Sequence, residues 1–168
     1  MTYAIPTSSL LAKTSCEYVD CFAIPVKGDP PILEVAKALF LSVPDWVRQM
    51  MNLRNYLVHR LGLKTATEPP NAEQVIQRFD GEVGSAIGLF KVYDRSENEI
   101  VFGQDDRHLN FRASLLLENG ETEKLLHFTT IVNFHNRFGR VYFVIVKPFH
   151  KIIVKRMLRS TKAYIERT

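Results

Sequence analysis

The first regular pattern in the sequence is a strict alternation of side chains over residues 17–26. Such a period of two predicts a β-strand. One face of this strand would carry Val19, Cys21 and Ala23, and the other would carry Tyr18, Asp20, Phe22 and Ile24.

Two helical patterns follow the strand. In the first, Asp29 is expected to cap a helix and Pro30 to open it. Its apolar positions are Ile32, Ala36, Leu39 and Phe40. The second begins near Pro44 and ends at Gly62, with an apolar stripe formed by Trp46, Val47, Met50, Leu53, Leu57, Val58 and Leu61. The next segment, 64–85, is irregular, and only a short helical turn near 72–78 is predicted there.

From residue 86 onward the pattern predicts an antiparallel sheet. Four segments, 86–94, 98–104, 107–118 and 122–135, read as strands, and the Asn-Gly pair between the last two is a strong hairpin signal. The third of these strands has an apolar face formed by Leu109, Phe111, Ala113, Leu115 and Leu117. The fourth strand has one formed by Leu126, Phe128, Thr130, Val132 and Phe134. Both faces must be covered by another element.

The C-terminal segment has two interpretations, because Pro148 lies inside it. As one kinked helix over 138–166, it places a single stripe on the sheet, formed by Phe138, Val141, Tyr142, Ile145, Phe149, Ile152, Ile153 and Met157. Alternatively, 141–146 form a strand and a shorter helix opens at Pro148. We favour the long helix, since the stripe keeps one phase across the proline. The predicted fold is therefore α+β, a helix-grip domain in which a curved antiparallel sheet wraps a long C-terminal helix.

Composition fits one domain over residues 1–168, with its core at about 17–166. Apolar residues make up 46% and charged residues 24% of the chain, as in ordinary globular proteins. Cys16 and Cys21 would point to opposite faces of a strand, so neither a disulfide nor a shared metal site is expected. No segment reaches the ~20 apolar residues of a spanning helix, and no signal peptide is evident. We therefore expect a cytoplasmic protein.

Charge is distributed unevenly between the two parts of the chain. Residues 137–168 hold nine Lys and Arg against one acid, or +8, whereas residues 1–136 hold thirteen against seventeen, or −4. A solvated helix face explains this asymmetry, and an anionic membrane surface is the alternative partner, contacted through Lys147, Lys151, Lys155 and Arg159. Nucleic acid is not expected, because the nearby aromatic residues belong to the stripe that should pack on the sheet.

Several stretches together are similar to a known family. They read VDCFAIPV, VRQMMNLRNYLVHRLGLKT, GQDDRHLNFR and FHNRFGRVYFVIVKPFH. Over about residues 17–160 they resemble an uncharacterised family of bacterial domains of unknown function. That family is in turn remotely similar to the START-like, helix-grip superfamily of polyketide cyclases and lipid-transfer domains. The remote similarity implies a cavity for a hydrophobic ligand.

Candidate polar residues cluster at two predicted strand ends. Asp105, Asp106 and His108 lie between two strands, and His135 ends the last strand before Asn136, which is expected to cap the final helix. Asp105, Asp106, His108 and His135 are the candidates for acid–base chemistry, although a turn-forming role is favoured for the first three and a capping role for Asn136. The sequence contains no metal-binding motif such as H-E-x-x-H, so neither a metal nor another cofactor is expected.

Three functions remain open from the sequence. The first is a non-catalytic module that binds a hydrophobic small molecule or lipid between sheet and final helix. Its expected ligand contacts are Phe111, Arg112, Phe128, Tyr142, Ile145 and Phe149. The second is a cyclase- or hydrolase-like enzyme acting on such a ligand, and the third is a domain that contacts a protein or a membrane surface. The binding module is preferred over the enzyme.

Overall fold

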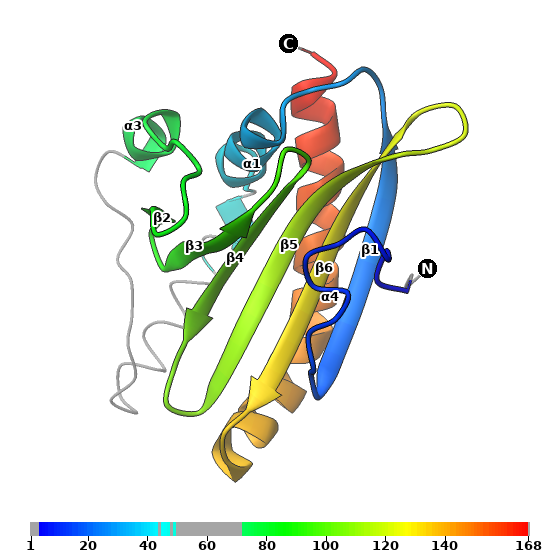
Figure 1. Cartoon of the computed structure of the whole chain (residues 1–168). Helices are drawn as coiled ribbons and strands as arrows, with labels where there is room; N and C mark the ends of the chain where they lie inside the picture. The colour runs from blue at the N-terminus through cyan, green and yellow to red at the C-terminus, as the bar shows by residue number, and fades with distance from the viewer. Residues whose placement is uncertain (1–3, 44, 48, 50–71, 168) are drawn as a thin grey trace.

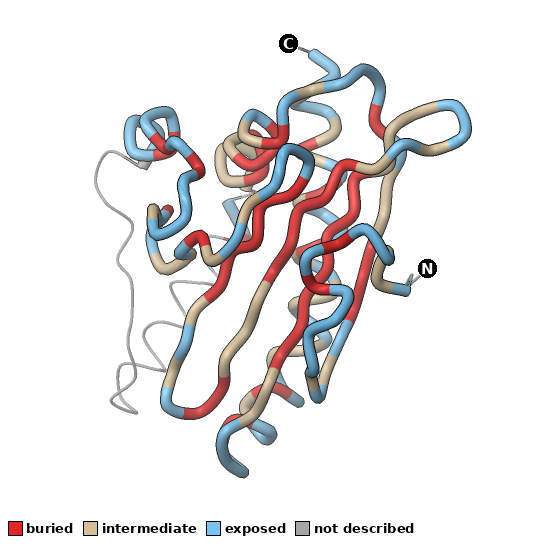
Figure 2. The backbone as a smooth tube through the Cα atoms, viewed as in Figure 1, coloured by how far each residue is buried: buried red, intermediate tan, exposed pale blue. Residues whose placement is uncertain are grey.

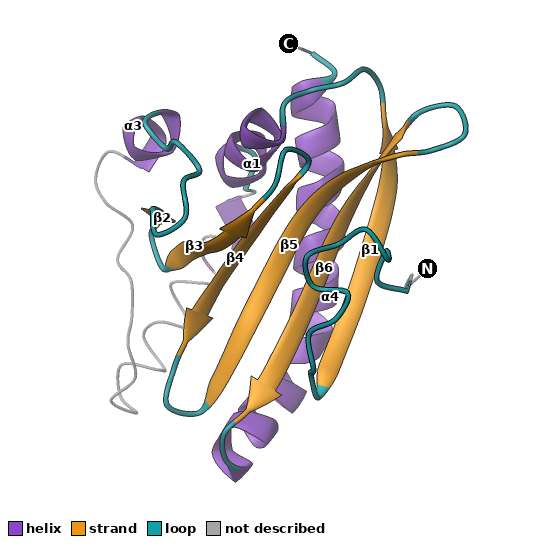
Figure 3. Ribbon diagram, viewed as in Figure 1, coloured by secondary structure: helices purple, strands orange, loops and turns teal. Residues whose placement is uncertain are grey.

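The computed structural model describes residues 4–43, 45–47, 49 and 72–167. Its centre is a six-stranded antiparallel sheet with strand order β1-β6-β5-β4-β3-β2 (Figures 1 and 3). The strands are β1 (Tyr18–Val26), β2 (Ala86–Ile87), β3 (Phe90–Arg95), β4 (Glu99–Asp105), β5 (Leu109–Asn119) and β6 (Lys124–Phe134). The helices whose bounds lie within the described residues are α1 (Ile32–Leu41), α3 (Ala72–Gln77) and α4 (Arg137–Ile165). The predicted α+β fold with a curved antiparallel sheet and a long C-terminal helix is confirmed.

Helices α1 and α4 pack on one face of the sheet, here called the helix-side face. The N-terminal segment crosses the opposite face (Figure 1), where Leu11 is buried against Val101 and Ile131. Figure 2 shows that burial is concentrated along the central strands between these two layers. The main core joins β1, β4, β5 and β6 to α1 and to the C-terminal half of α4, through residues such as Val35, Phe102, Leu115, Leu126 and Leu158.

The two interpretations of the C-terminal segment are now distinguished. Residues Arg137–Ile165 form one helix with Pro148 inside it, so no strand forms at 141–146. Asn136 caps this helix as predicted, because its side chain accepts a hydrogen bond from the Gly139 amide at 2.9 Å. The described part of the chain contains no helix long and apolar enough to cross a membrane.

Two local predictions are wrong. The strand predicted over 86–94 is split into β2 and β3, because Gly88 adopts φ +60° and turns the chain back into a short hairpin. Asp29 does not cap α1: its carboxylate pairs with the Lys124 ammonium at 2.7 Å, and the N-cap residue is Pro31. The helix predicted over 44–62, with its stripe from Trp46 to Leu61, lies largely outside the described residues.

The face of α4 that packs on the sheet also differs from the prediction. Its buried residues are Gly139, Phe143, Val154, Leu158 and Thr161. Ile145, Phe149 and Ile152, which the pattern assigned to the core, are exposed by 63%, 47% and 59%. The prediction failed because polar residues, among them Thr161 and the half-buried His150, occupy the inner face, while apolar residues occupy part of the outer one.

Candidate functional site

The loop between β4 and β5 brings two of its predicted site residues, Asp106 and His108, close together, but Asp105 lies apart from them. Asp105 is exposed and faces Arg112 at 2.8 Å and the Tyr93 hydroxyl at 3.0 Å. His108 instead is buried, with Nδ1 3.6 Å from an Asp106 oxygen and its ring edge-on to aromatic rings of α4. The side chains of Asp105 and His108 therefore lie in different environments.

Backbone contacts show that this loop positions the start of α4. The His135 amide donates to the His108 carbonyl oxygen at 3.0 Å, and the Asn136 side chain donates to the Arg107 carbonyl oxygen at 3.2 Å. A side chain at Gly139 would place a Cβ 2.1 Å from the same His108 oxygen. The segments around His108 and His135 thus contact each other and hold the start of the helix against the β4–β5 loop. We call this contact the docking joint. Within this joint, the imidazole of His135 is exposed.

The expected ligand contacts divide between three locations. Phe111 and Tyr142 are half-buried on the helix-side face, and Phe128 lies in the main core. Ile145 and Phe149 point outward from α4. Arg112 lies on the opposite face of the sheet, where its guanidinium stacks 3.5 Å from the Tyr93 ring centroid. Arg112, Ile145 and Phe149 therefore do not share a site with Phe111.

The helix-side face contains a buried acid that the sequence analysis did not single out. Asp20 on β1 is 1% exposed although it lies among the apolar side chains of that face. The Tyr18 hydroxyl donates to its Oδ2 at 2.5 Å, and Nε2 of His150 on α4 lies 3.4 Å from its Oδ1. The signal in the sequence was an acid between Tyr18 and Phe22 on the apolar side of an alternating strand.

Electrostatics keep the Asp20 carboxyl ionised. Burial by itself would raise the pKa of Asp20, but the hydrogen bond and charge of His150, the Tyr18 hydroxyl and the Lys151 charge together lower it below its usual value. Burial, followed by the Asp20 carboxylate, raises the pKa of Tyr18. Tyr18 therefore remains a neutral donor to a charged acceptor, and charge-assisted hydrogen bonds of this kind are stronger than neutral ones.

A second polar group lies beside this pair. Thr130 on β6 is the register partner of Asp20 and is 4% exposed. Its hydroxyl has no hydrogen-bond partner among the described residues. Leaving a hydroxyl buried without a partner costs about 1–3 kcal/mol, so native structures seldom retain one without a reason. We define the helix-side polar cluster as Asp20, Tyr18, His150 and Thr130.

The opposite face carries its own buried polar groups, and these hold the N-terminal segment. Glu99 accepts hydrogen bonds from the Ser9 hydroxyl at 2.6 Å, from the Leu10 amide at 2.7 Å and from the Ser114 hydroxyl. Cys21 and His127 also meet on this face, with Sγ 3.9 Å from Nδ1. Cys21 is completely buried, and burial raises the pKa of its thiol, so this pair lacks the accessible thiolate that nucleophilic catalysis needs.

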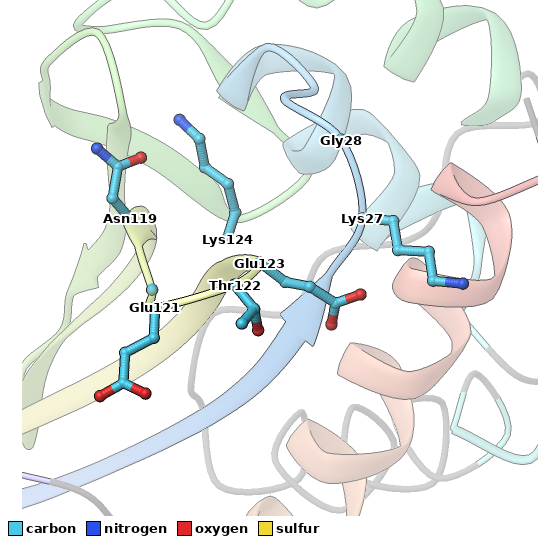
Figure 4. A pocket seen from close by; sticks show the side chains of 8 residues that line it. Lys27, Gly28, Asn119, Glu121, Thr122, Glu123 and Lys124 are labelled. Atoms are coloured by element: carbon cyan, nitrogen blue, oxygen red, sulfur yellow. The ribbon is translucent and has the colours of Figure 1, made fainter.

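One hollow in the described structure is lined by none of the residues of the helix-side polar cluster. It encloses about 450 Å³ at the β5–β6 turn and is lined by Lys27, Gly28 and residues 119–124. Figure 4 shows that the side chains around it point in different directions. Within the described ranges, no three His, Cys, Asp or Glu side chains gather where they could hold a metal ion.

These features define an α+β domain whose sheet carries a helix-side polar cluster under a single long helix. The chain belongs to the family described as Protein of unknown function (DUF2867), which it matches over residues 13–157. This confirms the resemblance to an uncharacterised domain family. No curated protein matches the chain. A similar solved structure is the crystal structure of a conserved protein from Geobacillus kaustophilus, with 12% identity, a TM-score of 0.46, and coverage of 89% of this chain and 96% of that one.

Proposed function

We propose that the protein binds a hydrophobic small molecule or lipid against the helix-side face of the sheet, with a polar group of the ligand at Thr130. The observation that carries this proposal is the buried, unpartnered Thr130 hydroxyl beside the Asp20–His150 pair. A ligand carbonyl, carboxylate or hydroxyl would supply the missing hydrogen bond and remove its cost.

The surroundings of Thr130 suit the apolar part of such a ligand. Phe111 is the register partner of Val132, so Phe111 is a diagonal neighbour of Thr130 on the same face. Its ring meets that of Phe90 with 6.0 Å between centroids, and both side chains remain partly exposed. Ligand sites usually combine such apolar walls with a few fixed polar groups. The remote similarity of the family to START-like domains favours the same class of ligand.

Two neighbouring threonines provide a matched test. Thr130 lies on the helix-side face, whereas Thr129 lies on the opposite face and donates to Cys21 at 3.2 Å. Titration with an environment-sensitive fatty-acid probe should show saturable binding that Thr130→Val weakens about tenfold, the worth of one hydrogen bond. Thr129→Val should leave binding unchanged. The proposal fails if the unmodified protein does not bind the probe saturably, or if the two variants bind alike.

A second candidate function, acid–base catalysis on the bound ligand, is favoured by the Asp20–His150 pair. A buried carboxylate that orients an imidazole is a common arrangement for a general base, and His150 keeps 20% of its side chain exposed. Native mass spectrometry of ligand that co-purifies with the protein would distinguish the two functions. An enzyme should yield a ligand whose mass differs between the unmodified protein and His150→Gln, whereas a carrier should yield the same ligand from both.

A further inference from the structure

The outward side of α4 presents a continuous row of large apolar side chains to solvent. This outer stripe consists of Phe138, Val141, Val144, Ile145, Phe149 and Ile152, which are 44–71% exposed. Apart from Val144 at its edge, its members are spaced three or four residues apart, so they lie along one side of the helix over roughly 20 Å. Exposed apolar surface of this extent usually marks a contact with a membrane or another protein.

The charged side chains of α4 do not cover the outer stripe. Arg140 pairs with Glu17, and the Lys147 ammonium lies 4.9 Å from the Tyr18 ring centroid, so both side chains contact the region of β1. Lys155 similarly lies over Phe22 at 5.3 Å. Lys147 and Lys155, two of the four basic residues that we expected to meet a membrane, are therefore directed toward the sheet.

Cations follow where the stripe ends. Arg156 and Arg159 are exposed and lie four and seven residues after Ile152, which places them on the same side of the helix. No Asp or Glu occurs between Arg137 and Ile165. The outward side of α4 is thus apolar for about four turns and then basic, without a single acid.

We infer that this side of α4 docks onto an anionic membrane surface, with the outer stripe in the boundary between headgroups and acyl chains and Arg156 and Arg159 at the phosphates. Interfacial helices combine an apolar face with cations in this way, and each cation near the surface adds to the attraction. A membrane needs no hydrogen bond from the stripe, and the stripe offers none.

Charge argues against the other occupants of this surface. A second copy of the chain docked through the same stripe would bring two acid-free, basic helices together, and like charges in contact oppose association. A protein partner would ordinarily form about one hydrogen bond for each 100–200 Å² of interface, but the six side chains of the stripe carry no donor or acceptor.

Cosedimentation of the whole chain with vesicles tests the inference. The unmodified protein should bind phosphatidylcholine vesicles that contain phosphatidylserine at low salt, and more weakly at about 0.15 M salt. A double variant of the stripe, which carries both Ile145→Ser and Ile152→Ser, should bind the vesicles about tenfold or more weakly. Arg156→Glu with Arg159→Glu should weaken it comparably and reduce its dependence on salt. Val83→Ser is the matched control, because Val83 is 62% exposed but lies outside α4, and it should bind as the unmodified protein does.

Three results would overturn the inference. They are no binding by the unmodified protein at low salt, undiminished binding by the double-serine variant, and self-association of the protein in analytical ultracentrifugation that this variant abolishes. Since the substituted side chains are exposed, thermal unfolding of each variant should match that of the unmodified protein, which separates lost binding from lost folding.

Discussion

The imidazole of His150 and the carboxylate of Asp20 meet across the interior at 3.4 Å, although 130 positions separate them in the chain. Asp20 lies on the edge strand β1 and His150 near the middle of α4. The contact therefore joins the long helix to the sheet through a polar interaction as well as through apolar packing. It also places an ionised acid where most domains of this size keep only apolar side chains.

Asp20 should make stability depend on acid pH. The pKa of Asp20 is lowered in the folded protein, so its contribution is complete above its ordinary pKa of 3.8 and is lost as the pH falls through the lower, folded value. Asp20→Asn should cost about 1–3 kcal/mol near neutral pH, and the difference should shrink toward pH 3. Urea denaturation between pH 3 and pH 7 measures it. Asp94→Asn, at an exposed acid of β3, is the control, and a pH-independent difference for Asp20→Asn would contradict the assignment.

The two neighbouring threonines should differ in their effect on the unliganded protein. Thr130→Val removes a buried hydroxyl without a partner in the described structure, so the free energy of unfolding should stay the same or rise by up to about 1 kcal/mol. Thr129→Val removes the hydrogen bond to Cys21 and should cost about 1 kcal/mol. Chemical denaturation of both variants without ligand gives the comparison. Equal losses would mean that Thr130 has a hydrogen-bond partner in solution.

Gly139 should not tolerate a side chain. Gly→Ala within a helix ordinarily stabilises by about 0.5–1 kcal/mol, but here the new Cβ would lie 2.1 Å from the His108 carbonyl oxygen. Gly139→Ala should therefore destabilise by at least about 1–3 kcal/mol, as overpacking does. Thermal unfolding shows the sign directly, and a gain in melting temperature would refute the docking joint.

Two truncations on α4 should report which side of the helix packs. Leu158 is 1% exposed, and Leu158→Ala should cost about 2–5 kcal/mol. Ile145 is 63% exposed, and Ile145→Ala should stay within about 0.5 kcal/mol of the unmodified protein. Urea denaturation measures the loss in free energy of unfolding for each variant. A larger loss for Ile145→Ala than for Leu158→Ala would mean that the stripe expected from the sequence packs on the sheet.

Local patterns predicted the elements better than their contacts. The alternation in β1, the Asn-Gly turn between β5 and β6, and the long C-terminal helix follow from neighbouring residues and are present in the structure. The rotation of α4 was mispredicted, because its buried face includes Gly139 and Thr161, which a pattern of large apolar side chains does not mark. The Asp20–His150 pair was missed for a related reason: the sequence contained both residues, but a local period cannot report a partner 130 positions away.

The pairing of the first strand with the last has a consequence for synthesis. Cys21 on β1 lies opposite Thr129 on β6, 108 positions later in the chain. At ribosomal rates of about 5–20 residues per second, β1 waits roughly 5–20 s for its partner strand. During this time its apolar side chains have no sheet to join. Nascent chains that stop before Lys124 should therefore be held by chaperones or degraded, since β1 can pair with its neighbour in the sheet only when β6 has left the ribosome.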